Sequence, residues 1–284
     1  MGMLMAEMFD MAEKEFIPLV TVFELTHRCN ERCTHCYLEE YGTNGRQELT
    51  TSEVKSLLDG LAAEGGFWLT LSGGEIFLRK DFFEIAAYAR QLEFGLTIFT
   101  NAMLITDDIA RRLKPLHLME VGISLYSSNA DQHDAITKVK GSFHKTIAGA
   151  KRLRDQGIPV NLKCPLMKSN LTEYQGIIDL AGSIGARYSF DPTIVPKNDG
   201  GGNFREIRLD EAGLRKLFSD PKLYPKDPVQ GKNAPPFPSP TPSPTRGEGT
   251  STSHCFTPRH SRDNWRLQAL QALRETDPYR LRRR

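Results

Sequence analysis

The chain has 284 residues, of which 39% are hydrophobic and 25% are charged. This composition is typical of a folded globular protein and excludes a fibrous chain or one disordered throughout. The formal net charge of +2 provides no general attraction to nucleic acid or to acidic lipid, so no nucleic-acid partner is expected.

The beginning of the chain lacks the order of a secretory signal, because Glu7, Asp10 and Glu13 precede any apolar run. The apolar runs further along, at 16–22 and 67–71, are far shorter than the roughly 20 residues needed to cross a bilayer. We therefore expect a cytoplasmic protein with no membrane segment. Its cysteines are expected to be reduced there.

From residue 16 to residue 218, short β-branched or apolar runs alternate with stretches of helical periodicity. This alternation predicts an α/β fold of six β-α units, a partial (β/α)6 TIM-like barrel. The expected strands are residues 20–25, 67–71, 96–100, 120–125, 160–165 and 188–194. The expected helices are residues 51–63, 81–92, 107–113, 142–156 and 172–184. The first of these helices begins with a capping-type sequence at Thr50 to Glu53.

The composition changes after a last expected helix at 209–218, where prolines become frequent among Ser, Thr and Gly. Such a segment cannot bury a core, so we expect a disordered Pro/Ser-rich C-terminal segment. The predicted organisation is an N-terminal extension at 1–15, the barrel at 16–218, a flexible linker at 219–253 and a remnant C-terminal tail at 254–284 with a short helix at 263–273.

Three cysteines, Cys29, Cys33 and Cys36, lie in a polar loop after the first expected strand, with the spacing C-x3-C-x2-C. Three thiolates suit a 4Fe-4S cluster in which the fourth iron stays open for another ligand. The amino and carboxylate groups of S-adenosylmethionine could chelate that iron. The alternative is a zinc site completed by His27 or His35, because zinc prefers four N or S ligands.

The same segment resembles the C-x3-C-x-φ-C signature of the radical S-adenosylmethionine (SAM) superfamily, with His35 before the last cysteine. The resemblance implies one 4Fe-4S cluster on the three cysteines and S-adenosyl-L-methionine as the second cofactor. It also implies reductive cleavage of that cofactor to a 5′-deoxyadenosyl radical. A flavodoxin or ferredoxin is the implied electron donor.

Further matches to the superfamily follow at the ends of later strands. Gly73-Gly74-Glu75 resembles the GGE motif that meets the methionine amino group. Asn101, after the third strand, suits a ribose or carboxylate contact, with an ordinary helix cap as the alternative. Ser124, at the end of the fourth strand, matches a position that touches the ribose or methionyl group. These residues are the predicted cofactor-binding set, together with His35.

Residues 131–143 resemble the HD-x-I stretch of radical enzymes that carry a SPASM domain, with Lys138 at a usual glycine position. The His133-Asp134 pair is expected to brace a loop rather than to act as a base. Relatives of this kind include peptide and sulfatase maturases, so the resemblance implies a peptide or protein substrate.

The resemblance breaks beyond the barrel, where Cys255 is the only cysteine. A SPASM domain needs several thiolates for its auxiliary clusters, so the chain lacks an intact SPASM domain and no auxiliary cluster is expected. Two alternatives follow: a zinc-stabilised, non-catalytic α/β binding protein, and a truncated, inactive remnant of a radical SAM enzyme.

Overall fold

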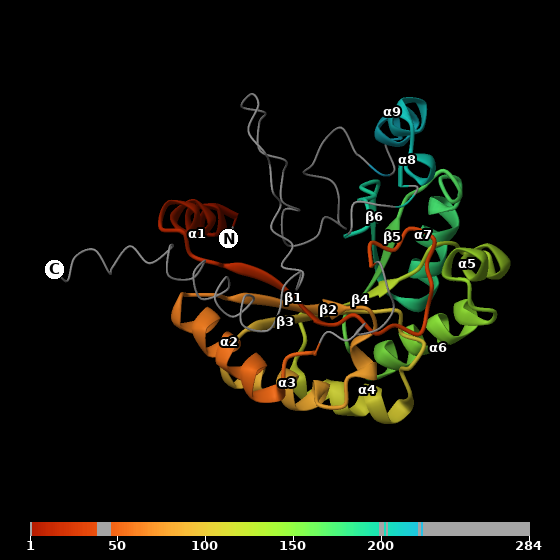
Figure 1. Ribbon diagram of the computed structural model, residues 1–284. Helices are drawn as coiled ribbons and strands as arrows, with labels where there is room; N and C mark the ends of the chain where they lie inside the picture. The colour runs from red at the N-terminus through yellow and green to blue at the C-terminus, as the bar shows by residue number, and fades with distance from the viewer. Residues whose placement is uncertain (1, 39–46, 199–201, 203, 221–222, 224–284) are drawn as a thin grey trace.

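Six strands form one parallel sheet in which each strand pairs with the next along the chain (Figure 1). The computed structural model describes residues 2–38, 47–198, 202, 204–220 and 223. The strands are β1 (Val20–Thr26), β2 (Trp68–Gly73), β3 (Gly95–Thr100), β4 (Glu120–Ser124), β5 (Val160–Pro165) and β6 (Arg187–Asp191). This topology confirms the expected α/β partial barrel, and it brings the carboxyl ends of all six strands to one edge.

Helices connect consecutive strands, and Figure 1 shows α2, α3, α4 and α6 together on one side of the sheet. The expected helices are present as α2 (Thr51–Ala63), α3 (Phe82–Gln91), α4 (Asp107–Leu113), α6 (Ser142–Asp155), α7 (Tyr174–Ile184) and α9 (Glu211–Ser219). The short helices η1 (Ile76–Leu78), η2 (Lys114–Leu116) and α8 (Phe204–Ile207) lie between them. The predicted cap of α2 is present, because Thr50 Oγ1 accepts from Glu53 N while Glu53 Oε2 accepts from Thr50 N.

Besides these short helices, two longer helices among the described residues were not expected from the sequence, namely α1 (Gly2–Lys14) and α5 (Ala130–Thr137). α1 lies within the predicted N-terminal extension, and its Phe9 ring stacks on Trp68 with 5.7 Å between ring centroids. α5 is capped by Asn129, whose side chain accepts from Gln132 N. Its buried face includes His133 and a threonine rather than a full apolar stripe, so helical periodicity is weak there.

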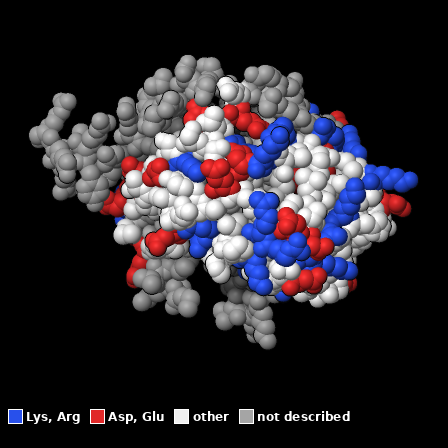
Figure 2. All heavy atoms as spheres, turned by 90° about the horizontal axis from the view of Figure 1, so that it is seen from below, with Lys and Arg blue, Asp and Glu red and all other residues white. Residues whose placement is uncertain are grey.

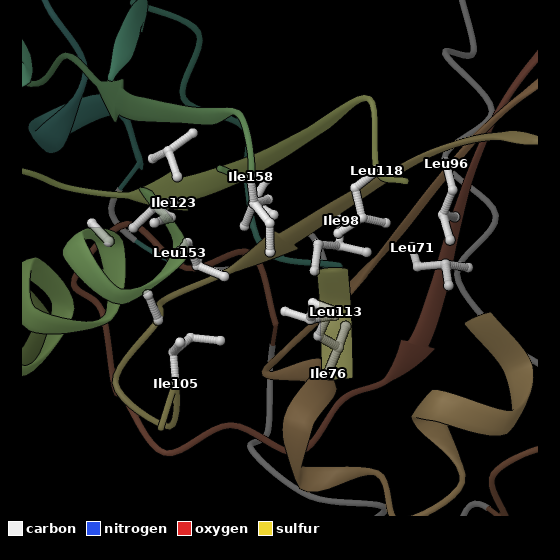
Figure 3. Close-up of a cluster of buried hydrophobic side chains, with 14 of the residues drawn as sticks. Leu71, Ile76, Leu96, Ile98, Ile105, Leu113, Leu118, Ile123, Leu153 and Ile158 are labelled. Carbon is white, nitrogen blue, oxygen red and sulfur yellow. The ribbon is translucent and has the colours of Figure 1, made fainter. Parts of the chain in front are cut away.

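The main hydrophobic core lies between the sheet and the helices (Figure 3). Strand side chains that face the helices, such as Leu71, Ile98 and Ile123, have 0% exposure. Their neighbours along β2 and β3 are only half-buried. One face of the sheet is therefore closed by helices, while the opposite face stays open to hold polar groups.

The surface carries charges of both signs, and Figure 2 shows basic and acidic side chains interspersed on the face seen from below. Among the described residues, no helix is long and apolar enough to cross a membrane. Residues 224–253 of the predicted linker, and the whole predicted tail with its helix at 263–273, lie outside the described residues. The domain boundaries therefore stay predictions.

Candidate functional site

The loop that carries Cys29, Cys33 and Cys36, called the cysteine loop below, leaves the end of β1 at Thr26 and runs along the carboxyl edge of the sheet. Two backbone hydrogen bonds attach it to the end of α5, since Arg32 N donates to Thr137 O at 3.0 Å and Thr34 N donates to Ile136 O at 2.9 Å. The loop that carries the cysteines is therefore held by β1 at its start and by α5 at its middle.

Among the three predicted cluster ligands, Cys36 interacts with each of the other two. Cys36 N donates to Cys33 O at 3.1 Å, and the charge of Cys36 contributes to a raised pKa at both Cys29 and Cys33. Burial is the largest cause, and it raises the pKa of Cys29 to about 12. Thiols in such surroundings become thiolates when a metal centre supplies positive charge.

The side chains of the loop fit an iron-sulfur cluster. Glu31 Oε1 and His35 Nδ1 are buried without hydrogen-bond partners. Such atoms destabilise the folded protein unless a bound group interacts with them. No three His, Cys, Asp or Glu side chains within the described part of the chain are grouped to hold one metal ion.

Cys33 has two polar neighbours that its position in the sequence did not reveal. Its thiol donates to Glu31 Oε2 at 3.3 Å, and Tyr126 Oη lies 3.6 Å from its Sγ. Burial raises the pKa of Glu31 to about 7. Tyr126 follows Ser124 by two residues at the end of β4, so strand alternation is the signal that could have placed it near the loop.

The turn after β2 needs glycine at positions 73 and 74, because the backbone at the end of β1 packs closely against it. A Cβ at Gly73, where φ is +135°, would lie 2.3 Å from Thr26 O, and one at Gly74 would lie 2.3 Å from Arg28 O. Gly74 N donates to Thr26 O at 2.7 Å. The glycines thus let this turn pack against the start of the cysteine loop, and the expected contact of Gly73 and Gly74 with the cofactor stays a prediction.

Glu75 has 0% exposure, and its carboxylate connects β2 to β3. It accepts hydrogen bonds from Phe77 N, from Thr100 Oγ1 and from Asn101 N at 2.8–3.1 Å. Burial raises the pKa of Glu75 to about 6, against the lowering effect of these hydrogen bonds. Its carboxylate therefore positions the end of β3, and direct contact with the methionine amino group stays a prediction.

Asn101 reaches from the end of β3 to the cysteine loop. Its side-chain amide donates to Asn30 Oδ1 at 2.7 Å and lies 4.0 Å from Cys29 Sγ. The helix-cap alternative is not realised for α4, because Thr106 caps that helix by accepting from Ile109 N. Asn101 is thus brought beside the predicted cluster ligands.

The other predicted contacts gather around Tyr126. The His35 ring packs edge-on against the Tyr126 ring at 4.8 Å between centroids, and burial lowers the pKa of His35 to about 4. Burial raises the pKa of the Tyr126 phenol well above its usual value, and a side-chain hydrogen bond with Ser124 acts against this rise. All the predicted site residues thus come from β1, β2, β3 and β4 or from the turns that follow these strands.

The His133-Asp134 pair braces the structure, as expected. Asp134 accepts from Gly141 N, from Ser142 Oγ and from Phe143 N at the start of α6. His133 is buried, and its Nδ1 accepts from Tyr126 N at 3.2 Å. The pair therefore joins α5 to α6 and to the end of β4.

A second set of contacts supports the start of the cysteine loop. It could not be predicted from the sequence, because its residues are far apart in the chain. Glu48 accepts from Arg28 at 3.1 Å through both carboxylate oxygens, and it also accepts from Thr26 Oγ1. Arg79, 5% exposed, donates to Leu25 O and to Leu49 O. The segment before α2 is thereby fixed against the end of β1.

Comparison with known proteins agrees with this geometry. The profile of the radical SAM superfamily matches residues 23–181, which is more than half of the chain and includes the three cysteines. The chain belongs to the radical SAM superfamily. Its members are enzymes, and membership implies an iron-sulfur cluster and SAM as cofactors.

Several characterised radical SAM proteins are similar to this chain. It is 37% identical over 161 residues to the Fe-coproporphyrin III synthase of Methanosarcina barkeri, covering 57% of this chain and 40% of that protein. It is 31% identical over 170 residues to the mycofactocin maturase MftC of Mycolicibacterium smegmatis, covering 60% of this chain and 43% of that protein. The chain thus spans less than half the length of these relatives.

Solved structures show the same radical SAM fold. SuiB of Streptococcus suis matches 73% of this chain and 47% of its own, with a TM-score of 0.60 and 19% sequence identity. Another match is anSMEcpe with bound AdoMet and a Cp18Cys peptide, which covers 71% of this chain and 59% of its own with a TM-score of 0.54 and 19% identity.

Proposed function

We propose that this chain binds one 4Fe-4S cluster through Cys29, Cys33 and Cys36 and cleaves S-adenosylmethionine reductively. The observation that carries the proposal is the loop of three cysteines at the carboxyl edge of the sheet, where Cys36 N donates to Cys33 O and Asn101 Nδ2 lies 4.0 Å from Cys29 Sγ. The partnerless Glu31 and His35 atoms beside them support it.

When bound, the cofactors would supply the difficult chemistry: the cluster would give one electron to the sulfonium, whose C–S bond cleavage would provide methionine and a 5′-deoxyadenosyl radical able to take a hydrogen atom from the substrate. The protein orients the cofactors and excludes water. Asn101 supports the loop from the end of β3, while Glu75 holds that strand end in place. The half-buried face of the sheet near Ser124 provides the polar surface for the nucleoside.

The substrate that we favour is a peptide or protein, with a flavodoxin or ferredoxin as the electron donor. Support comes from relatives whose names refer to maturation or to bacteriocin synthesis, such as MftC and AlbA. SuiB has been solved with a precursor peptide. Other relatives are named for haem synthesis, so the substrate class needs its own test.

The decisive experiment is anaerobic reconstitution of the full chain with iron and sulfide. About four irons per chain and a broad visible absorption are expected, together with release of 5′-deoxyadenosine when SAM and dithionite are added. Replacing Cys29, Cys33 and Cys36 with Ala should abolish both. The matched control is Cys164→Ala, which alters a buried cysteine outside the loop and should retain the cluster.

The same experiment separates the alternatives. Uptake of one zinc ion in place of iron would favour the zinc-stabilised binding protein. A chain that assembles the cluster and releases no 5′-deoxyadenosine would favour an inactive remnant of a radical SAM enzyme.

A further inference from the structure

A cavity of about 900 Å³ lies beside the cysteine loop, with Cys33 and Cys36 in its wall. Four basic side chains line it: Arg32, Lys138, Lys168 and Lys197. They come from four segments, namely the cysteine loop, the turn after α5, and the stretches after β5 and β6. Among the described residues of the lining, Glu206 is the only acidic one.

Backbone hydrogen bonds hold these four segments together. Arg32 N donates to Thr137 O, next to Lys138. Lys168 N donates to Ile207 O at 3.0 Å, which adjoins Glu206. Asn198 N, one residue beyond Lys197, donates to Tyr37 O at 2.9 Å, next to Cys36. The fold therefore brings these four basic residues to the wall of one cavity.

The three lysines of this cavity are exposed, and among the described residues none forms an ion pair with a carboxylate. Like charges around one cavity repel one another unless an anion enters it. A concave surface with charge of one sign also concentrates the opposite charge from solution. The cavity therefore favours a ligand with several negative groups.

The remaining lining indicates the kind of anion. Apart from the two cysteines, Ile207 is the only apolar side chain among the described residues that line the cavity. Sites for flat apolar molecules are instead lined mainly by apolar and aromatic groups. A more apolar hollow next to it, which includes Phe204 and Ile194, has a volume of only about 10 Å³, enough for about one water. A hydrophilic acidic chain fits this lining better than a ring system does.

We infer that the cavity lined by Arg32, Lys138, Lys168 and Lys197 binds a carboxylate-rich segment of the peptide substrate. This inference rests on the proposed function, because it concerns the substrate of the same site. The wall formed by Cys33 and Cys36 means that a peptide held there runs beside the predicted cluster ligands. Recognition is electrostatic, so it depends on the acidic residues of the peptide and on salt concentration.

The test measures binding of dye-labelled hexaglutamate, with hexaglutamine carrying the same dye as the uncharged probe. Fluorescence anisotropy is recorded on reconstituted full chain with SAM present. The rim variant combines K138E, K168E and K197E. The control variant combines K114E, K145E and K151E, which changes the net charge equally at exposed positions outside the cavity.

We expect hexaglutamate to bind the native chain and the control variant alike, and the rim variant at least about tenfold more weakly. Binding to the native chain should weaken as NaCl rises from about 50 to 200 mM. Equal binding by the rim variant, or equal binding of hexaglutamine, would overturn the inference. If butanetetracarboxylate at equal carboxylate concentration displaced the bound hexaglutamate, the result would overturn the peptide assignment in favour of a small polyacid.

Release of 5′-deoxyadenosine from the native chain is measured separately and reports on the proposed function. A chain that releases 5′-deoxyadenosine but does not bind hexaglutamate refutes only the cavity assignment. A chain that binds hexaglutamate but cleaves no SAM refutes the proposed function and, with it, the role of the bound peptide as substrate.

Discussion

The side-chain amide of Asn101 donates a 2.7 Å hydrogen bond to the side-chain carbonyl of Asn30, which joins the end of β3 to the cysteine loop. Asn101 is 6% exposed, and its Oδ1 accepts from Met103 N at 3.1 Å. One buried amide therefore shapes the turn after β3 and supports the loop between Cys29 and Cys33. The position of the cysteines therefore depends on a residue that is 71 positions beyond Asn30 in the chain.

Replacing Asn101 with Ala should destabilise the protein by about 1–3 kcal/mol, because Asn30 and Met103 each lose a buried partner. The cysteine loop should also retain less iron after reconstitution. Urea unfolding of the iron-free protein and iron content of the loaded protein measure the two effects. The control is Gln91→Ala, at an exposed position on α3. Full stability together with full iron content in Asn101→Ala would contradict this prediction.

The strands could be predicted from the sequence because a short run of apolar or β-branched residues marks a buried strand within a few consecutive positions. The expected strand at 160–165 is β5 without change, and helix 51–63 is α2 without change. The last strand was expected at 188–194 but is Arg187–Asp191. Thr193 N bonds to the Asp191 side chain instead of continuing the sheet, and such a side-chain turn is invisible to an apolar pattern.

Tyr126 should influence the reduction potential of the cluster. A thiolate bound to iron has no proton to donate, so the phenol 3.6 Å from Cys33 Sγ would be the donor. Such hydrogen bonds stabilise the reduced form. Removing the hydroxyl in Tyr126→Phe should lower the midpoint potential by about 20–60 mV, the equivalent of one hydrogen bond.

Spectroelectrochemical titration of the reconstituted protein measures this shift. The control is Tyr88→Phe, which removes a hydroxyl bonded to Asp59 on the helical side of the sheet. A potential equal to that of the native chain would exclude an effect of Tyr126 on Cys33.

The candidate site was only partly visible in the sequence. Cys29, Cys33 and Cys36 are close in the chain, so their spacing alone indicated a metal centre. Glu31 lies within the same loop, but its contact with Cys33 depends on how the loop folds. Lys197 is distant in sequence, and only the hydrogen bond from Asn198 to Tyr37 reveals that it lies near Cys36. Long-range contacts of this kind follow from the fold and carry no local signal.

His133 should make the folded protein less stable as the pH falls. Burial lowers its pKa to about 4 from a model-peptide value of 6.5, so between these values the unfolded chain binds more protons than the folded chain. Stability is then fully present above pH 6.5 and is lost as pH falls toward 4. The contribution is about 3 kcal/mol at most, from about 1.4 kcal/mol per pKa unit.

His133→Gln keeps a side-chain acceptor for Tyr126 N and removes the titration. Unfolding free energies of the iron-free protein at several pH values between 4 and 7 should fall less steeply in this variant than in the native chain. Because His35 titrates in the same range, the informative quantity is the difference between the two slopes. Identical slopes would show that His133 does not contribute.

Ile98 should be a main source of stability, because it lies in β3 at 0% exposure between the sheet and the helices (Figure 3). Ile98→Ala removes buried methyl and methylene groups and leaves a cavity, so it should cost about 2–5 kcal/mol. Val22→Ala is the matched strand control, because Val22 is 50% exposed in β1 and the protein should lose less than about 1 kcal/mol. Urea midpoints at an unchanged m-value measure both costs. Equal costs at the two positions would mean that the helix-covered face of the sheet is not the principal core.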